Sequence, residues 1–234
     1  MSLYALGDPH LSLGVDKPMD IFGGWGSYVE KIENNWREIV SEEDTVVLAG
    51  DISWAMRLSE SLPDFRFIDS LPGKKIIMKG NHDYWWETKT KIERFFSENN
   101  LTTMSTLFNN AYRVGDVAVC GTRGWFYDAK SEQDGKVLNR EVGRLKLSIE
   151  TGRKLGGEIV VFLHYPPVFA GKECPEIMNV LFEYNIRYCY YGHIHGKKAG
   201  SLATVGNYKN IEFKMVSCDQ TGFRPIPVNI RQGN

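Results

Sequence analysis

Several short apolar runs of this chain are each followed by side chains that bind metal ions in proteins. Runs such as 3–6 and 159–163 end directly before residues of this kind. The donors that follow the runs are Asp8, His10, Asp51, Asn81, His164, His193 and His195. Because ligands of open α/β sheets bind in the crevice outside the carboxyl ends of the strands, we expect these donors to converge although they span most of the chain. Their number exceeds what one ion takes and suits two ions about 3.5–4 Å apart that share a bridging carboxylate.

The chemistry of the donors narrows the choice of metal. Imidazole, carboxylate and amide oxygen without a thiolate suit manganese, iron, zinc, cobalt or nickel better than copper(I) or an iron–sulfur cluster. Among these, manganese or an iron–zinc pair is favoured. One histidine alone would be interpreted as a core or surface residue, but all 5 histidines of the chain fall at the ends of these runs. Together they predict a dinuclear metal site.

The order of these segments resembles a known family. In chain order the segments are Asp8-Pro9-His10, Gly50-Asp51, Gly80-Asn81-His82-Asp83, His164 and Gly192-His193-Ile194-His195. They resemble the five-block signature of the calcineurin-like metallophosphoesterase superfamily, and among its members the predicted bacterial-type phosphohydrolases. The resemblance spans residues 7–195. It implies an α/β fold, a four-layer α-β-β-α sandwich with two mixed β-sheets and a dinuclear metal site at the carboxyl ends of the strands.

The resemblance also implies a role for each residue of the blocks. The first metal would be held by Asp8, His10, Asp51 and His195. The second would be held by Asn81, His164 and His193, with Asp51 bridging the two. The catalytic residues would be His82 and Asp83. His82 would contact the phosphate and act as general acid on the leaving group, and Asp83 would orient its imidazole.

The reaction that the resemblance implies is hydrolysis of phosphomonoester or phosphodiester bonds by a hydroxide that bridges the metals. Attack is expected in line and without a phosphoenzyme, because no Cys or Ser nucleophile motif accompanies the blocks. Trp54 stands three residues past Asp51, where purple acid phosphatases carry a tyrosine. The Asp and Arg that follow this block in phosphoprotein phosphatases are absent, so both relatives are disfavoured. The alternatives are a metal-dependent nuclease and a non-catalytic metal-bearing interaction scaffold of the same fold.

Composition and charge set the class of protein and of partner. The chain has 234 residues, with 28 basic and 29 acidic side chains and a formal net charge of -1. We expect one globular domain over residues 1–234, because this length suits a single large core. A balanced charge lacks the usual signature of nucleic-acid or membrane coating. We therefore expect a small phosphorylated substrate as partner, with nucleic acid not favoured and the oligomeric state open.

The location of the protein is a further expectation from the sequence. No segment approaches the roughly 20 apolar residues of a membrane-spanning helix, and no signal peptide is recognised. We expect a cytoplasmic protein without a membrane partner. The 4 cysteines form no CxxC pair, which in this setting predicts reduced thiols that pack as small apolar residues.

Hydrophobic periodicity predicts the elements that position the donors. The expected strands are 3–6, 45–49, 75–79, 117–120, 159–163, 187–191 and 211–216. The expected helices are 27–40, 87–99, 139–155 and 175–184, with Ser27 as N-cap of the first. The alternation favours a mostly parallel sheet, and residues 101–121 hold successive strands that indicate a second sheet. Residues 122–140 are predicted as a loop or flap and 221–234 as an irregular terminal segment.

Aromatic residues are concentrated in the segments that follow strands. They are Trp25, Trp54, Trp85, Trp86, Trp125, Phe126, Tyr127 and Tyr165. One interpretation is a rim that grips a flat or apolar leaving group, helped by Arg123 or Lys79 near the phosphate oxygens. The other is hydrophobic packing of long loops. The sequence favours packing, so these residues are not assigned to the site.

Overall fold

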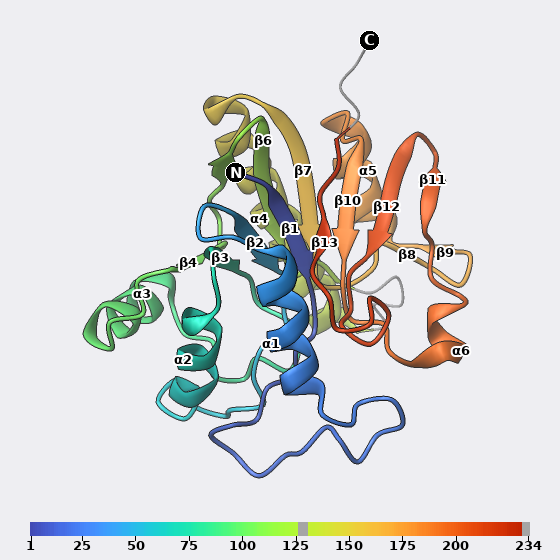
Figure 1. The fold of residues 1–234 in the computed structure, drawn as a ribbon. Coiled ribbons are helices and arrows are strands. Elements are labelled where there is room, and N and C mark those ends of the chain that lie inside the picture. Colours follow the sequence, from blue (N-terminus) through green and yellow to red (C-terminus); the bar gives the residue numbers. More distant parts are fainter. Residues whose placement is uncertain (126–130, 231–234) are drawn as a thin grey trace.

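Two β-sheets pack face to face and helices cover their outer faces (Figure 1). The computed structural model describes residues 1–125 and 131–230. Within these residues the four layers are helix, sheet, sheet and helix. The α-β-β-α sandwich expected from the sequence is confirmed.

The first sheet is parallel except at one edge. Its strands are, in order across the sheet, β13 (Ile226–Pro227), β1 (Leu3–Leu6), β2 (Thr45–Leu48), β3 (Lys74–Ile77) and β4 (Met104–Thr106). β13 runs antiparallel to β1, whereas β1 to β4 are parallel to one another. Parallel pairing brings the carboxyl ends of β1, β2 and β3 to the same edge, which is where the first three sequence blocks begin.

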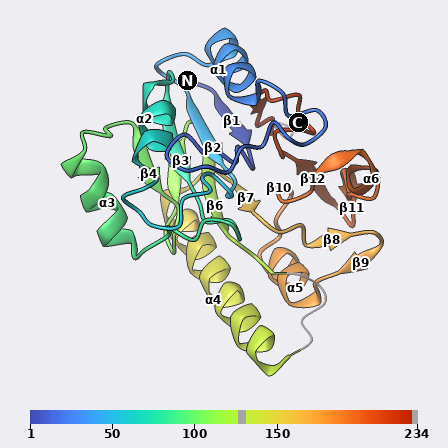
Figure 2. The same cartoon turned by 90° about the horizontal axis from the view of Figure 1, so that it is seen from below.

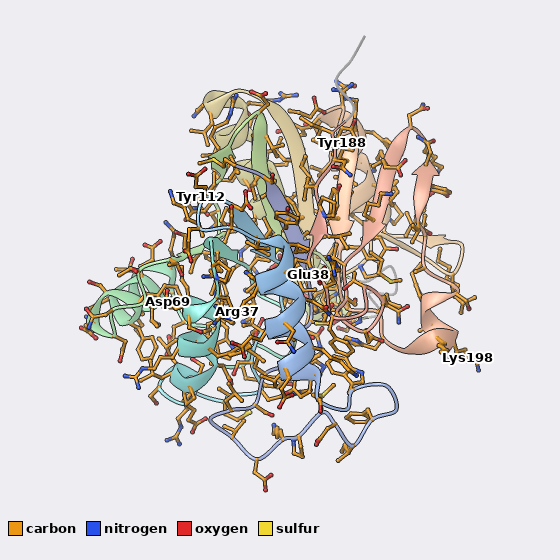
Figure 3. The ribbon with its side chains drawn as sticks, viewed as in Figure 1. Arg37, Glu38, Asp69, Tyr112, Tyr188 and Lys198 are labelled. Carbon is orange, nitrogen blue, oxygen red and sulfur yellow. The ribbon has the colours of Figure 1, made fainter. Side chains whose placement is uncertain are left out.

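The second sheet has antiparallel strands at both edges. Its strands are, in order, β11 (Gly206–Tyr208), β12 (Ile211–Met215), β10 (Tyr188–Tyr191), β7 (Glu158–Leu163), β6 (Val117–Thr122) and β5 (Tyr112–Val114). The four central strands are parallel. A separate two-stranded hairpin is formed by β8 (Val168–Phe169) and β9 (Lys172–Glu173). In Figure 3, Tyr188 lies where β10 begins, and Lys198 lies at the opposite end, beyond the blocks that follow the strands.

Helices from both halves of the chain cover the sheets. The first sheet is covered by α1 (Tyr28–Ile39), α2 (Leu62–Ser70) and α3 (Lys89–Glu98). The second sheet is covered by α4 (Glu132–Leu155) and α5 (Pro175–Glu183). Figure 2, seen from below, shows the two groups of helices on opposite sides of the molecule. The short α6 (Gly196–Gly200) follows the last sequence block directly.

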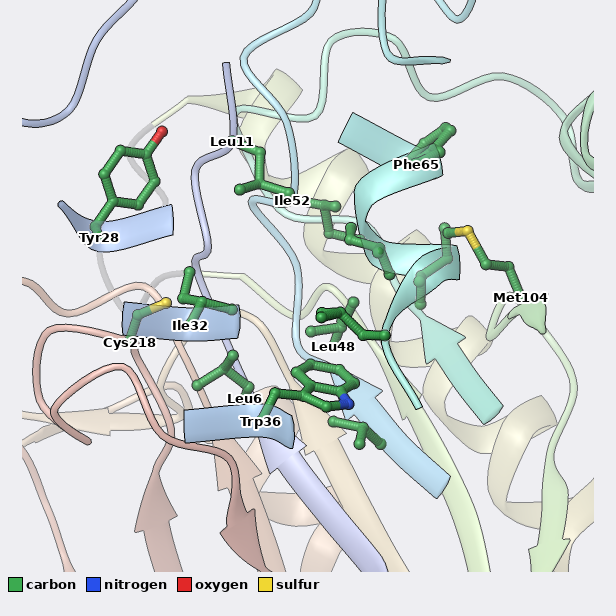
Figure 4. Close-up of a cluster of buried hydrophobic side chains, with 14 of the residues drawn as sticks. Leu6, Leu11, Tyr28, Ile32, Trp36, Leu48, Ile52, Phe65, Met104 and Cys218 are labelled. Carbon is green, nitrogen blue, oxygen red and sulfur yellow. The ribbon is translucent and has the colours of Figure 1, made fainter. Parts of the chain in front are cut away.

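The central strands β1, β2, β6, β7 and β10 are mostly buried on both faces, which explains their largely apolar sequences. In β2, Val46 and Leu48 face the helices, while Val47 belongs to the core between the sheets. The outer core of the first sheet is built around Trp36 and Leu6 (Figure 4). Because side chains alternate along a strand, each strand joins two cores and its end is held firmly in place.

The structure confirms the predicted strands and corrects several helix ends. Ser27 is the N-cap residue of α1, as predicted, but it lies in the left-handed region with φ 51° and its side chain makes no capping hydrogen bond. α4 starts at Glu132 because Ser131 and Asp134 form a capping box. Its first turns are exposed and carry no apolar period, which is why residues 122–140 resembled a loop.

Two further elements differ from the sequence expectation. The sequence did not predict α2, in which Pro63 stands in the first turn, a position that tolerates proline. The terminal segment predicted as irregular contains β13, which pairs with β1. All four cysteines are free and buried, as expected. Among the described residues, no helix has the length and apolar character needed to cross a membrane.

Candidate metal centre

The loops after the strands bring the predicted donors into two neighbouring groups. One group is Asp8, His10 and His195, and the other is Asp51, His164 and His193. In each group the ligand atoms all lie within 4.8 Å of one another. The residues come from the ends of strands in both sheets, so the centre lies where the two sheets meet.

Tight backbone turns aim these side chains. Asp8, His10, Asp51 and His193 all have positive φ, between 45° and 73°. Non-glycine residues adopt this region rarely, and clusters of such residues are typical of functional sites. A Cβ at Gly80 would collide with the Asp51 carboxylate, and one at Gly192 with the Asp8 carboxylate. The glycines of the blocks are therefore required by the close approach of the donors.

Asp51 belongs to the second group and also lies close to the first. Its Oδ2 is 3.7 Å from His10 Nε2 and 3.4 Å from His164 Nε2. This oxygen is buried and has no hydrogen-bond partner among the described residues, whereas Oδ1 accepts a hydrogen bond from the His82 amide at 2.7 Å. Burial opposes ionisation, but the nearby His164 and His10 imidazoles outweigh it and hold the pKa of Asp51 below its usual value.

The first group brings two imidazoles together. His10 Nε2 is 3.2 Å from His195 Nε2, and Asp8 Oδ1 is 3.8 Å from His195 Nε2. Burial lowers the pKa of His10 to about 3, so its imidazole is neutral and keeps a lone pair. Asp8 is fully buried and accepts a hydrogen bond from the His193 amide, which fixes the carboxylate.

The second group is centred on His164. Its Nδ1 lies 3.0 Å from the Ala49 carbonyl oxygen and its Nε2 lies 2.6 Å from Asn81 Oδ1. Both oxygens can only accept, so each ring nitrogen donates a hydrogen bond. Burial lowers the pKa of His164, but the Asp51 and Asp8 carboxylates raise it to about 9. The surrounding carboxylates thus favour a positive charge at this position.

These residues fit two divalent cations. The donors are imidazole nitrogens and carboxylate or amide oxygens, the set preferred by borderline divalent ions. The Oδ2 atom of Asp51 makes no hydrogen bond to any described residue and lies close to an imidazole of each group, so a divalent cation placed there would satisfy it.

The comparison with protein families agrees with this geometry. The model for calcineurin-like phosphoesterases matches residues 1–197. The chain belongs to the calcineurin-like phosphoesterase family. It is accordingly a metal-dependent hydrolase of phosphoric ester bonds. A comparison with curated proteins found no match.

Solved structures support the fold of this phosphoesterase. The protein TT1561 of Thermus thermophilus is similar with a TM-score of 0.59 and 12% identity, over 98% of each chain. A phosphopantetheinyl hydrolase from Mycobacterium tuberculosis is similar with a TM-score of 0.55 and 15% identity, over 99% of this chain and 98% of that one. At these identities the likeness shows the fold alone.

His82 lies beside the first ligand group of the phosphoesterase. Its ring centroid is 5.7 Å from that of His10 and 4.5 Å from the Trp54 ring. The Nδ1 atom of His82 has no hydrogen-bond partner within the described parts of the chain. Burial lowers the pKa of His82 below its ordinary value.

Asp83 has a different role from the one expected. Its Oδ2 accepts a hydrogen bond from the Gly80 amide at 2.7 Å, and its Oδ1 accepts bonds from the Ile52 amide at 2.8 Å and Trp85 Nε1 at 3.0 Å. Both oxygens are thus engaged by groups other than the His82 imidazole. This corrects the expectation that Asp83 orients the imidazole: the buried carboxylate joins the loops after β2 and β3.

One residue of the site was missed by the sequence analysis. Asp219 accepts a hydrogen bond from His195 Nδ1 at 2.9 Å through Oδ1 and from the Gly196 amide at 2.7 Å through Oδ2. It follows β12 and lies beyond the residues matched by the family model. The signal was present, because Asp219 is a polar residue just after the predicted strand 211–216.

The aromatic residues that follow the strands lie in different surroundings. Trp85 is buried in the outer core of the first sheet, as the packing interpretation expects. Trp25 is buried in the same core and Trp54 packs against it, but both also line a cavity of about 430 Å³ together with His10 and His82. Trp125 packs on Tyr165 and under the Arg123 guanidinium, away from this cavity. The other two aromatics of this loop, Phe126 and Tyr127, lie outside the described residues.

Proposed function

We propose that this phosphoesterase uses two divalent cations to hydrolyse phosphomonoester or phosphodiester bonds in line and without a phosphoenzyme. The observation that carries the proposal is the position of Asp51, whose unpartnered Oδ2 lies within 3.7 Å of an imidazole of each group. A carboxylate shared by two sets of donors is the arrangement that suits a pair of cations.

Each cation has a proposed set of ligands. The first set is Asp8, His10, Asp51 and His195, and the second is Asp51, Asn81, His164 and His193. When bound, the cations supply a water of lowered pKa and positive charge for the phosphoryl oxygens. Manganese, or an iron–zinc pair, stays a prediction, as does a cytoplasmic location.

The chain itself supplies a proton donor in His82. Its imidazole borders the cavity beside the first ligand group. In the free protein the lowered pKa keeps this imidazole neutral near pH 7. The negative charge of a bound phosphoryl group raises an imidazole pKa, so His82 gains a proton there and donates it to the leaving oxygen.

The state of the thiols supports a reaction without a phosphoenzyme. All four cysteines are buried, and burial raises the pKa of Cys120 to about 12 and of Cys174 to about 11. A thiol that is neutral and buried is a poor nucleophile. Ser53 is also buried, and its hydroxyl donates to Asp64.

Replacement of His82 tests the proposal. Manganese-loaded protein should hydrolyse p-nitrophenyl phosphate or bis(p-nitrophenyl) phosphate. His82→Ala should lower kcat by roughly 10²–10⁴-fold, because a positioned proton donor is lost. Metal analysis should still give about two ions per chain, as the two-cation arrangement requires. Loss of metal in this variant, or undiminished turnover, would contradict the assigned role.

One contact supports the interpretation of the chain as a single domain. Asp219 lies beyond residue 197, where the family match ends, yet it contacts His195 of the metal centre. We therefore propose that the whole chain forms a single phosphohydrolase domain whose partner is a small phosphorylated substrate.

A further inference from the structure

The cavity beside the metal centre has two kinds of wall. One wall is formed by the imidazoles of His10, His82 and His195. The other is apolar and is formed by Met19, Phe22, Trp25 and Trp54. The cavity has a volume of about 430 Å³, which lies within the range of binding sites for small molecules.

The apolar wall is continuous with the metal ligands. The Trp54 ring stacks on His10, with centroids 4.8 Å apart and planes 19° apart. The centroid of the Trp25 ring lies 5.6 Å from that of the His195 ring. A phosphoryl group held at the ligands therefore places the rest of the ester against these indoles, next to the proposed proton donor His82.

Among the described residues, those that line the cavity include no carboxylate, lysine or arginine. Lys17 lies near, with Nζ 5.4 Å from the centroid of the Trp54 ring, but does not line the cavity. The apolar wall itself offers a charged group no ion-pair partner, whereas an apolar group is stabilised by covering it.

The mouth of the cavity is apolar as well. Phe22 is 54% exposed and its neighbour Ile21 is 73% exposed. Phe22 thus continues the apolar wall to the solvent, and a contiguous exposed apolar patch is typical of a binding site.

We propose that this cavity is the leaving-group subsite and accepts an uncharged, apolar aromatic or alkyl group of the phosphate ester. The inference rests on the proposed hydrolase function and adds the class of substrate. In this proposal Trp25, Trp54 and Phe22 select the leaving group of the substrate, whereas the sequence analysis favoured a packing role for the two tryptophans.

Glycines offer a matched pair of variants for the test. Apart from its chain neighbours, a Cβ at Gly23, which lines the cavity, would meet no atom of the described residues within 4 Å, and the same holds at Gly26, which does not line it. Neither residue has a positive φ. Gly23→Leu should therefore fill the cavity without disturbing the fold, and Gly26→Leu controls for the added side chain.

The test compares two esters whose leaving alcohols differ in apolar size but hardly in acidity with a third whose leaving group is polar. Manganese-loaded wild type is assayed with 2-phenylethyl phosphate, ethyl phosphate and glycerol 3-phosphate. We expect kcat/KM for the phenylethyl ester to exceed that for the other two esters by about tenfold to a hundredfold, because the cavity buries the phenyl group. Gly23→Leu should remove the preference, Phe22→Ser should reduce it, and Gly26→Leu should keep it.

Binding of phosphonates separates this inference from the function on which it rests. Calorimetry with 2-phenylethylphosphonate and ethylphosphonate measures the cavity without turnover. Equal kcat/KM for the three esters would overturn the apolar subsite and leave the hydrolase intact. Preferential binding of the phenyl compound without turnover of any ester would support the subsite and refute the hydrolase. Equal binding of the two phosphonates would overturn the subsite.

Discussion

Asp219→Asn should weaken one of the two cation sites. In the wild type the Asp219 carboxylate holds His195 Nδ1 at 2.9 Å and the Gly196 amide at 2.7 Å. An asparagine in this position keeps one acceptor oxygen, so its NH₂ group faces either the His195 ring N–H or the Gly196 N–H. The variant therefore loses the charge and gains a donor–donor contact at one of the two partners, so the ring of His195 is held less firmly than in the wild type.

The size of the effect follows from this arrangement. Removal of a carboxylate that orients a metal-binding histidine typically costs 10–100-fold in affinity, or about 1.4–2.8 kcal/mol. We expect the loss at the site that contains His195. The other site should change little, because His164 is oriented by the Ala49 carbonyl and not by Asp219.

The assay is a two-site manganese titration by calorimetry. Asp116→Asn is the matched control. The Asp116 side chain is 82% exposed and pairs with Arg113. It lies in the turn between β5 and β6, at the end of β6 that is remote from the metal centre. Unfolding of the metal-free proteins should show whether the fold is retained. An Asp219→Asn variant that binds both cations as tightly as the wild type would refute the reasoning, as would an equal loss at both sites.

Two further predictions concern buried charges. Asp83→Asn should lower the free energy of unfolding by roughly 2–4 kcal/mol, because four N–H groups then face an amide in place of a carboxylate. Burial raises the pKa of Asp83 to about 7, so the loss is measured by urea denaturation above that pH, where the carboxyl is ionised. An unchanged midpoint there would contradict the loop-joining role. Burial lowers the pKa of Lys75 to about 8, below its ordinary 10.5, so between these values the unfolded chain binds more protons and stability rises with pH. The rise is at most about 1.4 kcal/mol per pH unit. Lys75→Met should abolish that contribution in denaturation curves at pH 8 to 10, and an identical pH profile in the variant would show that Lys75 does not cause it.

The strand ends and their donors could be predicted because both signals are local. β2 and β7 are buried on both faces, so their sequences are continuously apolar, and the first polar residue after each marks the sheet edge. Asp51 and His164 were found in this way. Helix ends were predicted less well, since α4 is fixed by a capping box rather than by apolar periodicity.

The sequence by itself determined which residue types stand at the ends of the strands, and with them the family, the fold class and the expected chemistry. Tertiary structure decided what those residues touch. Asp83 is adjacent to His82 in the chain, yet its carboxylate accepts hydrogen bonds from the Gly80 amide of its own loop and the Ile52 amide of the loop after β2. Trp54 and Trp85 both follow strands, but one lines the cavity and the other is buried. The physical reason is that orientation depends on packing and hydrogen bonds between segments distant in sequence, such as Asp219 and His195, 24 residues apart.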